Sequence, residues 1–447
     1  MSRLQRILIT TTLLTCVGQA AFAASFEDAL TATYNENPRI KAERQKLEAT
    51  DEGVSQALSG FRPSISASYE KGRQRTDFGN SGWSYGDSER KGLTVSQPLF
   101  RGGGTWYSFK RAQQSQRAGQ YILSATEQDV LLSAITSYMD IIANSAILEL
   151  ARSNEQVLAE QLKAADTRFQ VGEVTRTDVA QSQARLSSAK SAVIAADGQL
   201  RVAIAAFTRV AGYTPEGTLH APEKLPELPA TLDEALEYAR NANPQLLATL
   251  HVAKASRYDV NVTQSRLLPT VSLVGSMSRQ DGAGANGASS FDQDKVGIEV
   301  SIPLYQSGAE YSRVREASAV ARQRDHESID TRMAIDASVT QTWQELETAI
   351  ATITTREDQI KAAQIALDGV RQEQQYGSRT VLDVLDAEQE LFTARTNLVR
   401  AQRDRIVNAY TLAFTLGQLT PPALGLSVAQ YDPSVHAGDV KWKPIGF

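Results

Sequence analysis

The stretch "SFEDALTATYNENP", from Ser25 to Pro38, decides the fold of this chain because it occurs twice. Its second copy, "TLDEALEYARNANP", runs from Thr231 to Pro244. Each copy begins with a hydroxyl residue followed three positions later by an acid, the capping box that starts a helix. Each copy ends in an Asn-Pro pair, which interrupts a helix. A chain that repeats a punctuated helix is expected to repeat a whole structural unit.

Further matches follow in the same order. "FRPSISASY" from Phe61 matches "LLPTVSLVG" from Leu267, and "GLTVSQPLFRGG" from Gly92 matches "GIEVSIPLYQSG" from Gly297. A Pro-rich segment between the copies is typical of a linker. The sequence therefore predicts a signal peptide at 1–23, a first repeat at 24–211, a linker at 212–230, a second repeat at 231–417 and a C-terminal tail at 418–447.

Each repeat is expected to contain one two-stranded hairpin. The opening helix should run to Pro63 in the first copy and Pro269 in the second, interrupted at the Asn-Pro pair. Apolar residues then alternate with serines, as Ile65 and its neighbours do, which is the period of a strand. Glycine-rich segments at 79–87 and 281–290 are expected to form the two hairpin turns, with Trp83 in the first.

A very long helical tract follows each hairpin. No proline interrupts the chain between Pro98 and Pro215, or between Pro303 and Pro421, and apolar residues recur at steps of three and four. This pattern is typical of a coiled-coil seam. A helix from Gly104 to Phe169 would be on the order of 100 Å long, far more than a compact globule needs.

The N-terminus has the order of a secretory signal: basic Arg3 and Arg6, an apolar run, and an A-x-A site ending at Ala23. The only cysteine, Cys16, lies inside the apolar run, and its lipidation remains an alternative. Cleavage after Ala23 would leave no cysteine for disulfides or thiolate metal sites. We therefore expect an exported protein.

Composition argues against several functions. The net charge of −5 is spread along the chain, whereas a nucleic-acid surface needs clustered Lys and Arg. The four histidines are scattered without metal-ligand spacing, so no enzyme activity, metal or cofactor is expected.

After the signal sequence, no segment holds about 20 consecutive apolar residues, the length that a transmembrane helix needs. Four strands cannot close a membrane barrel, which takes about eight, so several chains would have to share one. Two hairpins on a soluble coiled coil remain the alternative.

The turns between the long helices differ in one respect. "GEVTRTDVAQSQA" begins at Gly172 and "GSRTVLDVLDAEQ" at Gly377, and both contain the Thr-x-x-Asp pattern of a helix cap. The matched caps are Thr175 with Asp178 and Thr380 with Asp383. Asp386 aligns with Gln181, and Arg379 aligns with Val174, so helix capping explains neither residue.

This duplicated order, its paired strands and its two "G-x-x-T-x-x-D" turns resemble the TolC family of outer-membrane export ducts over nearly the whole mature chain. The resemblance implies a mainly α-helical homotrimer. Its long α-helical coiled-coil barrel would continue into an outer-membrane β-barrel of twelve strands, four from each chain. The linker and the tail would form a mixed equatorial region around the middle of the tunnel.

The same resemblance implies a location, a function and partners. The protein would lie in the outer membrane of a Gram-negative bacterium, in contact with lipid, and extend into the periplasm. It would export small molecules or secreted proteins together with a periplasmic adaptor and an ABC or proton-driven inner-membrane transporter. The alternative from another class is a soluble periplasmic coiled-coil adaptor or scaffold without a pore.

Carried over by position, the family's gate falls on the two turns. Asp383 and Asp386 would form acidic rings at the periplasmic aperture, as charged rings do in cation-selective pores. Links from Arg379 to Thr177 and Asp178 would hold the tip shut. The family's gating tyrosine position holds Gln374 here, with Tyr376 nearby.

Overall fold

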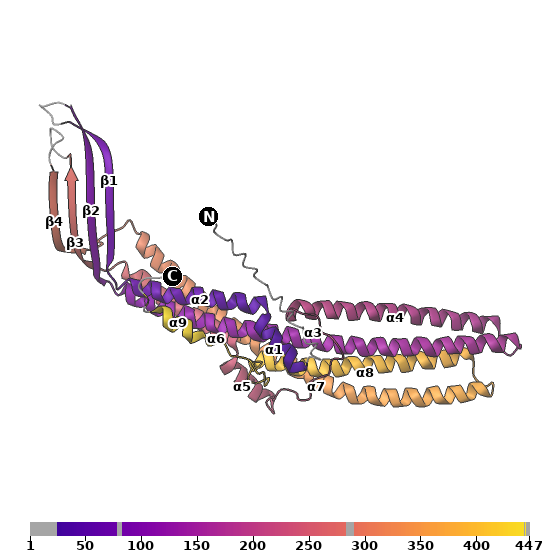
Figure 1. The fold of residues 1–447 in the computed structure, drawn as a ribbon. Helices are drawn as coiled ribbons and strands as arrows, with labels where there is room; N and C mark the ends of the chain where they lie inside the picture. Colours follow the sequence, from indigo (N-terminus) through magenta and orange to yellow (C-terminus); the bar gives the residue numbers. More distant parts are fainter. Residues whose placement is uncertain (1–24, 78–82, 283–289, 442, 444–447) are drawn as a thin grey trace, which may run out of the picture.

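The computed structural model describes residues 25–77, 83–282, 290–441 and 443. The predicted signal peptide, with Cys16, lies outside the described residues, as do most of the two hairpin turns. The molecule is elongated, with a β-sheet at one end and two long helical hairpins at the other (Figure 1).

One element order occurs twice along the chain. The first set is α1 (Phe26–Glu36), α2 (Pro38–Ser59), β1 (Ser64–Asp77), β2 (Trp83–Arg101), α3 (Gly104–Gln170) and α4 (Arg176–Ala211). The second set is α5 (Leu232–Ala242), α6 (Pro244–Ser265), β3 (Thr270–Asp281), β4 (Ser290–Ser301), α7 (Ala309–Gln375) and α8 (Val381–Leu416). A short helix, α9 (Pro433–Lys441), lies in the tail and packs on α2.

Three predicted boundaries were wrong. Helices α2 and α6 end at Ser59 and Ser265, before Pro63 and Pro269, because the residue before a proline is disfavoured in the helical region and the chain turns earlier. Trp83 does not lie in the hairpin turn: it begins β2 and pairs with Asp77. An aromatic residue favours a strand over the glycine-rich turn beside it, and the Arg75 guanidinium lies 3.8 Å from the Trp83 ring centroid.

The Asn-Pro pairs join the start of each repeat to its end. The Asn37 side-chain oxygen accepts from the Arg39 N–H at 2.8 Å, and its amide donates to the Val210 carbonyl at 2.7 Å. Asn243 makes the equivalent contact to the Thr415 carbonyl at 2.8 Å. One asparagine thus caps the helix that follows it and satisfies a carbonyl near the end of the returning long helix. The break in the helix is therefore the place where the start of each repeat is hydrogen-bonded to the end of its long returning helix.

The main core lies at the middle of the molecule, where α1, α3, α4 and α8 meet. Phe26, Tyr138, Phe207 and Tyr410 stack there in edge-on and tilted pairs. The linker lies against this core, because the Tyr138 hydroxyl donates to the His220 carbonyl at 3.1 Å. The tail supplies leucines to the same cluster.

Helix α3 has the length and composition of a membrane span over one window, with a mean hydropathy of 1.4, and half of that window is buried within the chain. It contacts α1, α2, α4, α6 and α8. Its apolar composition is accounted for by its position as the central helix of the core.

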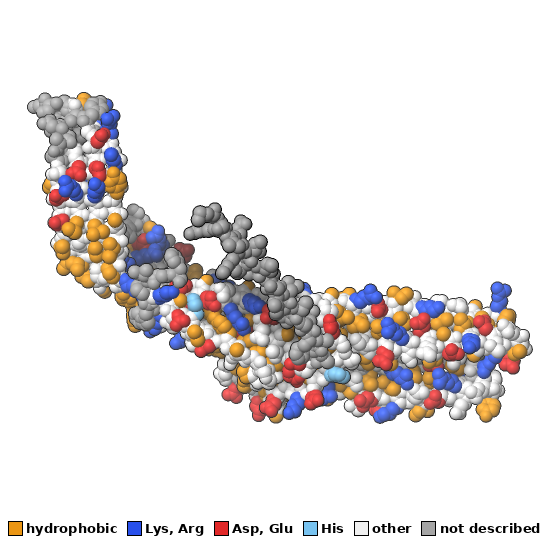
Figure 2. Space-filling view, in the orientation of Figure 1, with side chains coloured by type: hydrophobic (Ala, Val, Ile, Leu, Met, Phe, Trp, Pro, Cys, Tyr) orange, Lys and Arg blue, Asp and Glu red, His pale blue; other side chains and the backbone are white. Residues whose placement is uncertain are grey.

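The sheet is antiparallel in the order β1-β2-β3-β4, so β1 and β4 are its edges. Its register places serines and threonines on one face and apolar residues on the other. The apolar face is exposed, with Val296 at 82% and Ile298 at 67%. Figure 2 shows these side chains gathered on the part of the sheet nearest the helices, with charged residues beyond them. A band of this kind fits lipid rather than water.

Candidate functional site at the helical tip

Both helical hairpins turn on a left-handed glycine, Gly172 with φ 80° and Gly377 with φ 78°. A capping box follows each one. The Asp178 carboxylate accepts from the Thr175 N–H at 2.8 Å, and the Thr175 hydroxyl accepts from the Asp178 N–H at 3.3 Å. Thr380 and Asp383 repeat this arrangement at the same distances. The predicted capping role of both aspartates is confirmed.

The cap also governs the charge of Asp383. Hydrogen bonds from the Thr380 N–H and hydroxyl lower the pKa of the Asp383 carboxyl below its ordinary value, and the nearby Arg379 charge lowers it further. Asp383 therefore stays ionised at neutral pH and holds a fixed negative charge at the tip.

Asp386 has a partner that the sequence did not reveal. It lies one turn further along α8 and accepts from the Arg185 guanidinium of α4, so this ion pair joins the two hairpins. The Arg185 and Asp386 side chains are 38% and 56% exposed. Arg185 aligns with Glu390 in the second copy, and this reversal of charge was the available signal.

Arg379 lies on the same turn but points elsewhere. Its Nε donates to Glu373 Oε2 at 2.8 Å, and this contact raises the pKa of the guanidinium. Within the chain as described, no contact joins Arg379 to Thr177 or Asp178. Tyr376 ends α7 and is 88% exposed.

The other predicted tip residues remain open to solvent or to another chain. Within the described residues, the side chains of Thr177, Gln374 and Tyr376 make no hydrogen bond in the chain. The structure thus brings Arg379 to Glu373 and Asp386 to Arg185, and the predicted gate links stay predictions.

Apolar contacts fix the position of α8 at the tip. Val381 and Leu385 pack against leucines of α3 and α4, whereas Val384 and Leu391 face α7. Glu388, only 7% exposed, lies close to α7 and accepts from Arg371 there. The start of α8 is therefore wedged between its own hairpin partner and the first hairpin.

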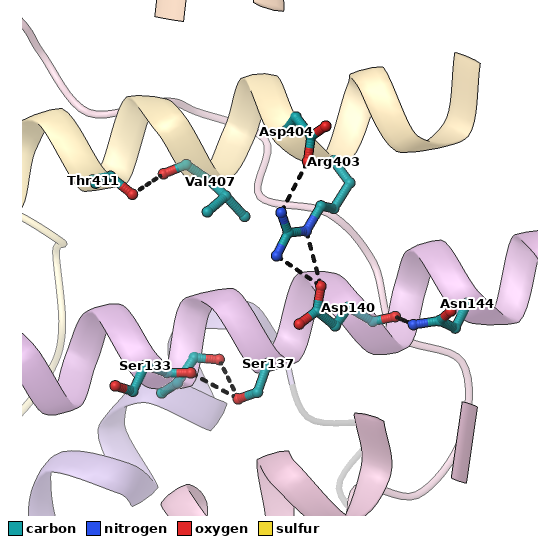
Figure 3. A network of polar contacts seen from close by, with 9 residues as sticks. Ser133, Ser137, Asp140, Asn144, Arg403, Asp404, Val407 and Thr411 are labelled. Carbon is teal, nitrogen blue, oxygen red and sulfur yellow. Dashed lines mark hydrogen bonds and ion pairs between the residues drawn. The ribbon is translucent and has the colours of Figure 1, made fainter. Parts of the chain in front are cut away.

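A second ion pair joins α8 to the first hairpin further from the tip. Arg403 donates through Nε and Nη2 to Asp140 Oδ1 at 2.9 and 2.8 Å, and through Nη1 to Asp404 at 2.9 Å (Figure 3). Helix α8 is thus attached by charge at two levels, to α4 near the tip and to α3 beside the main core.

The described residues hold no group of three or more His, Cys, Asp or Glu side chains placed to bind a metal ion. The tip offers fixed charges and cross-links between helices.

A duplicated helical rod that ends in a sheet with one exposed apolar face defines a class of protein, the subunit of a membrane channel with a long helical tunnel. The family described as "Outer membrane efflux protein" matches residues 30–213 and again residues 235–418. The chain therefore belongs to the outer membrane efflux proteins, the TolC family. It lies in the outer membrane with its helices in the periplasm, and the family consists of channels rather than enzymes.

Individual relatives agree with this assignment. The chain is 33% identical to the outer membrane efflux protein BepC of Brucella suis, covering 98% of this chain and 95% of BepC. It is 26% identical to the alkaline protease secretion protein AprF of Pseudomonas aeruginosa, covering 92% and 88%. The CmeC outer membrane channel of Campylobacter jejuni has the same fold, with a TM-score of 0.77 at 16% identity over 93% of this chain and 88% of that one.

Proposed function

We propose that three copies of this chain form one export duct through the outer membrane and across the periplasm. The observation that carries the proposal is the four-stranded sheet with an exposed apolar face and two open edges. An open edge cannot stand in lipid. Three sheets closed edge to edge would make a barrel of about twelve strands, which is large enough for a pore.

We infer that the duct receives its cargo from an inner-membrane transporter, ABC or proton-driven, through a periplasmic adaptor. The names of its relatives point to two kinds of cargo, since BepC is an efflux protein and AprF a protease secretion protein. A strain lacking this gene should become sensitive to small toxic compounds, or lose proteins from its culture medium, or both. Restoring the gene should reverse the defect. A strain unchanged in both respects would contradict the proposal.

Membership of the outer membrane efflux proteins argues against the soluble scaffold, and fractionation tests the proposed trimer. A duct should stay with outer-membrane fractions as a trimer that heating separates into chains. A scaffold would appear in the periplasmic extract. The exposed apolar band argues for the duct, because water would make contact with it in any soluble form.

The tip is proposed as the gate. In a trimer, Asp383 and Asp386 would place six carboxylates around one axis, three of them paired with Arg185 of the same chain, and rings of carboxylates bind cations. Asp386→Ala should therefore weaken block of the channel by hexamminecobalt, measured in a planar lipid bilayer. Asp140→Asn, a carboxylate removed far from the tip, is the control. Block of undiminished strength in Asp386→Ala would argue against the acidic ring.

A further inference from the structure

Both edge strands of the sheet carry charged side chains that have no ion pair. On the inner strands, Lys91 pairs with Glu89 at 2.6 Å, Arg279 pairs with Asp281 at 3.3 Å, and Arg90 donates a hydrogen bond to Gln280 at 2.8 Å. Among the described residues of the two edge strands, Glu70 and Lys71 on β1 and Asp294, Lys295 and Glu299 on β4 form no ion pair.

The two edges carry opposite charge on the apolar side of the sheet. The register places Ala67, Leu93, Met277 and Asp294 in one row on that side. On this same apolar side, β1 carries Lys71 and Arg73, whereas β4 carries Asp292 and Asp294. A basic edge and an acidic edge on one chain are complementary between copies of the chain.

We propose that β4 of one copy pairs with β1 of the next through these charges, which set the register of the seam between chains. This inference rests on the proposed trimer. It adds which residues meet at the seam and how far the strands are shifted.

Barrel geometry limits the shift. Ser64, Ser96, Val274 and Gly297 form one row across the sheet. Twelve strands tilted by about 35–45°, spaced about 4.8 Å apart with a rise of about 3.3 Å per residue, need a total stagger of roughly 12 to 17 residues. Each chain contributes a third of it, about four to six residues. An even shift is required, because an odd one would turn the apolar face inward.

A stagger of about four residues toward the turns gives four of these edge charges a partner of opposite sign. It places Asp294 opposite Lys71, Lys295 opposite Glu70, and Asp292 opposite Arg73. Nearer the helices, the same register places Val300 opposite Ile65, Ile298 opposite Ala67 and Val296 opposite Tyr69. On the apolar side of the seam, charge meets opposite charge near the turns and apolar meets apolar nearer the helices, whereas on the other side Glu299 lies opposite Ser66.

The other staggers fit worse. The same shift in the opposite direction would place Asp292 opposite Ile65, inside the apolar band, where a carboxylate is costly. A stagger of about six residues would oppose Val296 to Lys71 and Lys295 to Gly72. Exposed ion pairs add little affinity, so their effect here is to select the register and to disfavour mispaired strands.

Disulfide formation tests the register directly, because Cys16 is the only cysteine of the chain. In a full-length Cys16→Ser background, the Lys71→Cys/Asp294→Cys variant is isolated from outer membranes and oxidised. Opposed residues in a strand pair have Cβ atoms about 4.5–5.5 Å apart, close to disulfide range. Denaturing electrophoresis should show chains linked to one another. The matched control, Lys71→Cys/Val296→Cys, should show far less linkage.

Native electrophoresis of the same samples separates the two proposals. If the protein runs as a monomer, the proposed trimer is wrong and the seam with it. If the trimer is intact but residue 71 links to 296, or does not link to 294, the trimer stands and this register is overturned.

A charge swap provides a measurement independent of disulfide geometry. Lys71→Glu should lower the temperature at which the trimer dissociates in detergent, since it faces Asp294 across the seam. Adding Asp294→Lys should restore most of the loss. If the two substitutions lower the temperature additively, the residues do not meet and the inference fails.

Discussion

The ion pair between Arg185 and Asp386 is expected to hold the tip of the duct closed, because it joins the two helical hairpins of a chain where they end. Arg185→Gln keeps the length of the side chain and removes its charge. A partly exposed pair of this kind contributes about 0.2–1 kcal/mol. Three copies acting together would contribute about 1.5 kcal/mol, which corresponds to a roughly tenfold change in the ratio of closed to open tips.

Single-channel recording in a planar lipid bilayer measures this ratio. Arg185→Gln should raise the mean conductance, and the difference from the wild type should shrink at high salt, which screens exposed pairs. Arg176→Gln is the control, because it removes the same charge from the same tip and Arg176 has no ion pair among the described residues. Equal conductance in Arg185→Gln and the wild type, with the trimer intact, would refute the reasoning.

Three other expectations follow from the contacts. Arg379→Ser should raise the single-channel conductance, because it removes the proposed links from Arg379 to Thr177 and Asp178. Glu373→Gln removes only the partner that Arg379 has within the chain, and it should leave the conductance unchanged. Unchanged conductance in Arg379→Ser would count against the links. Gly417→Ala should lower the melting temperature more than Gly212→Ala. Both glycines have φ 83°, but a Cβ added at Gly417 would lie 2.7 Å from the Ala242 carbonyl oxygen, whereas one added at Gly212 would meet no atom within 4 Å. Equal effects would show that this close approach does not matter. Burial raises the pKa of Glu127 although Arg44 and Tyr34 donate to it, so the folded protein binds a proton more tightly than the unfolded chain. The contribution of Glu127 to the free energy of unfolding should therefore fall as pH rises above about 4.5, and Glu127→Gln should flatten the melting temperature across that range; identical pH profiles would contradict it.

Local hydrogen bonding explains what the sequence predicted well. The capping aspartates, the turn glycines and the Asn-Pro breaks act within a few residues of themselves, so a short pattern specifies them. The long helices and the strand alternation follow from periodicity in the same way. Trp83 was misplaced because glycine-rich segments mark a turn without marking its ends.

Contacts between distant segments could not be read in this way. Arg185 and Asp386 are 201 positions apart, and Arg403 and Asp140 are 263 apart. Each pair depends on how α8 packs against the first hairpin, which no local pattern states. Arg379 shows the same limit, since its partner within the chain is a near neighbour, Glu373, rather than the turn of the other repeat.

The comparison of the two repeats suggests why the tip residues diverged. Positions that build each repeat are the same in both copies, as at the caps and the Asn-Pro breaks. The pair of Arg185 with Asp386 instead joins one repeat to the other, and its counterpart between neighbouring chains would be Glu390 with Gln181. Those two side chains cannot form an ion pair, and Glu390 already accepts from Gln359. In a trimer, charged links at this level would therefore alternate with unlinked seams around the axis. A ring of six identical hairpins would have to loosen everywhere at once, whereas in the proposed trimer three seams between copies would be free to part while each chain stays held together.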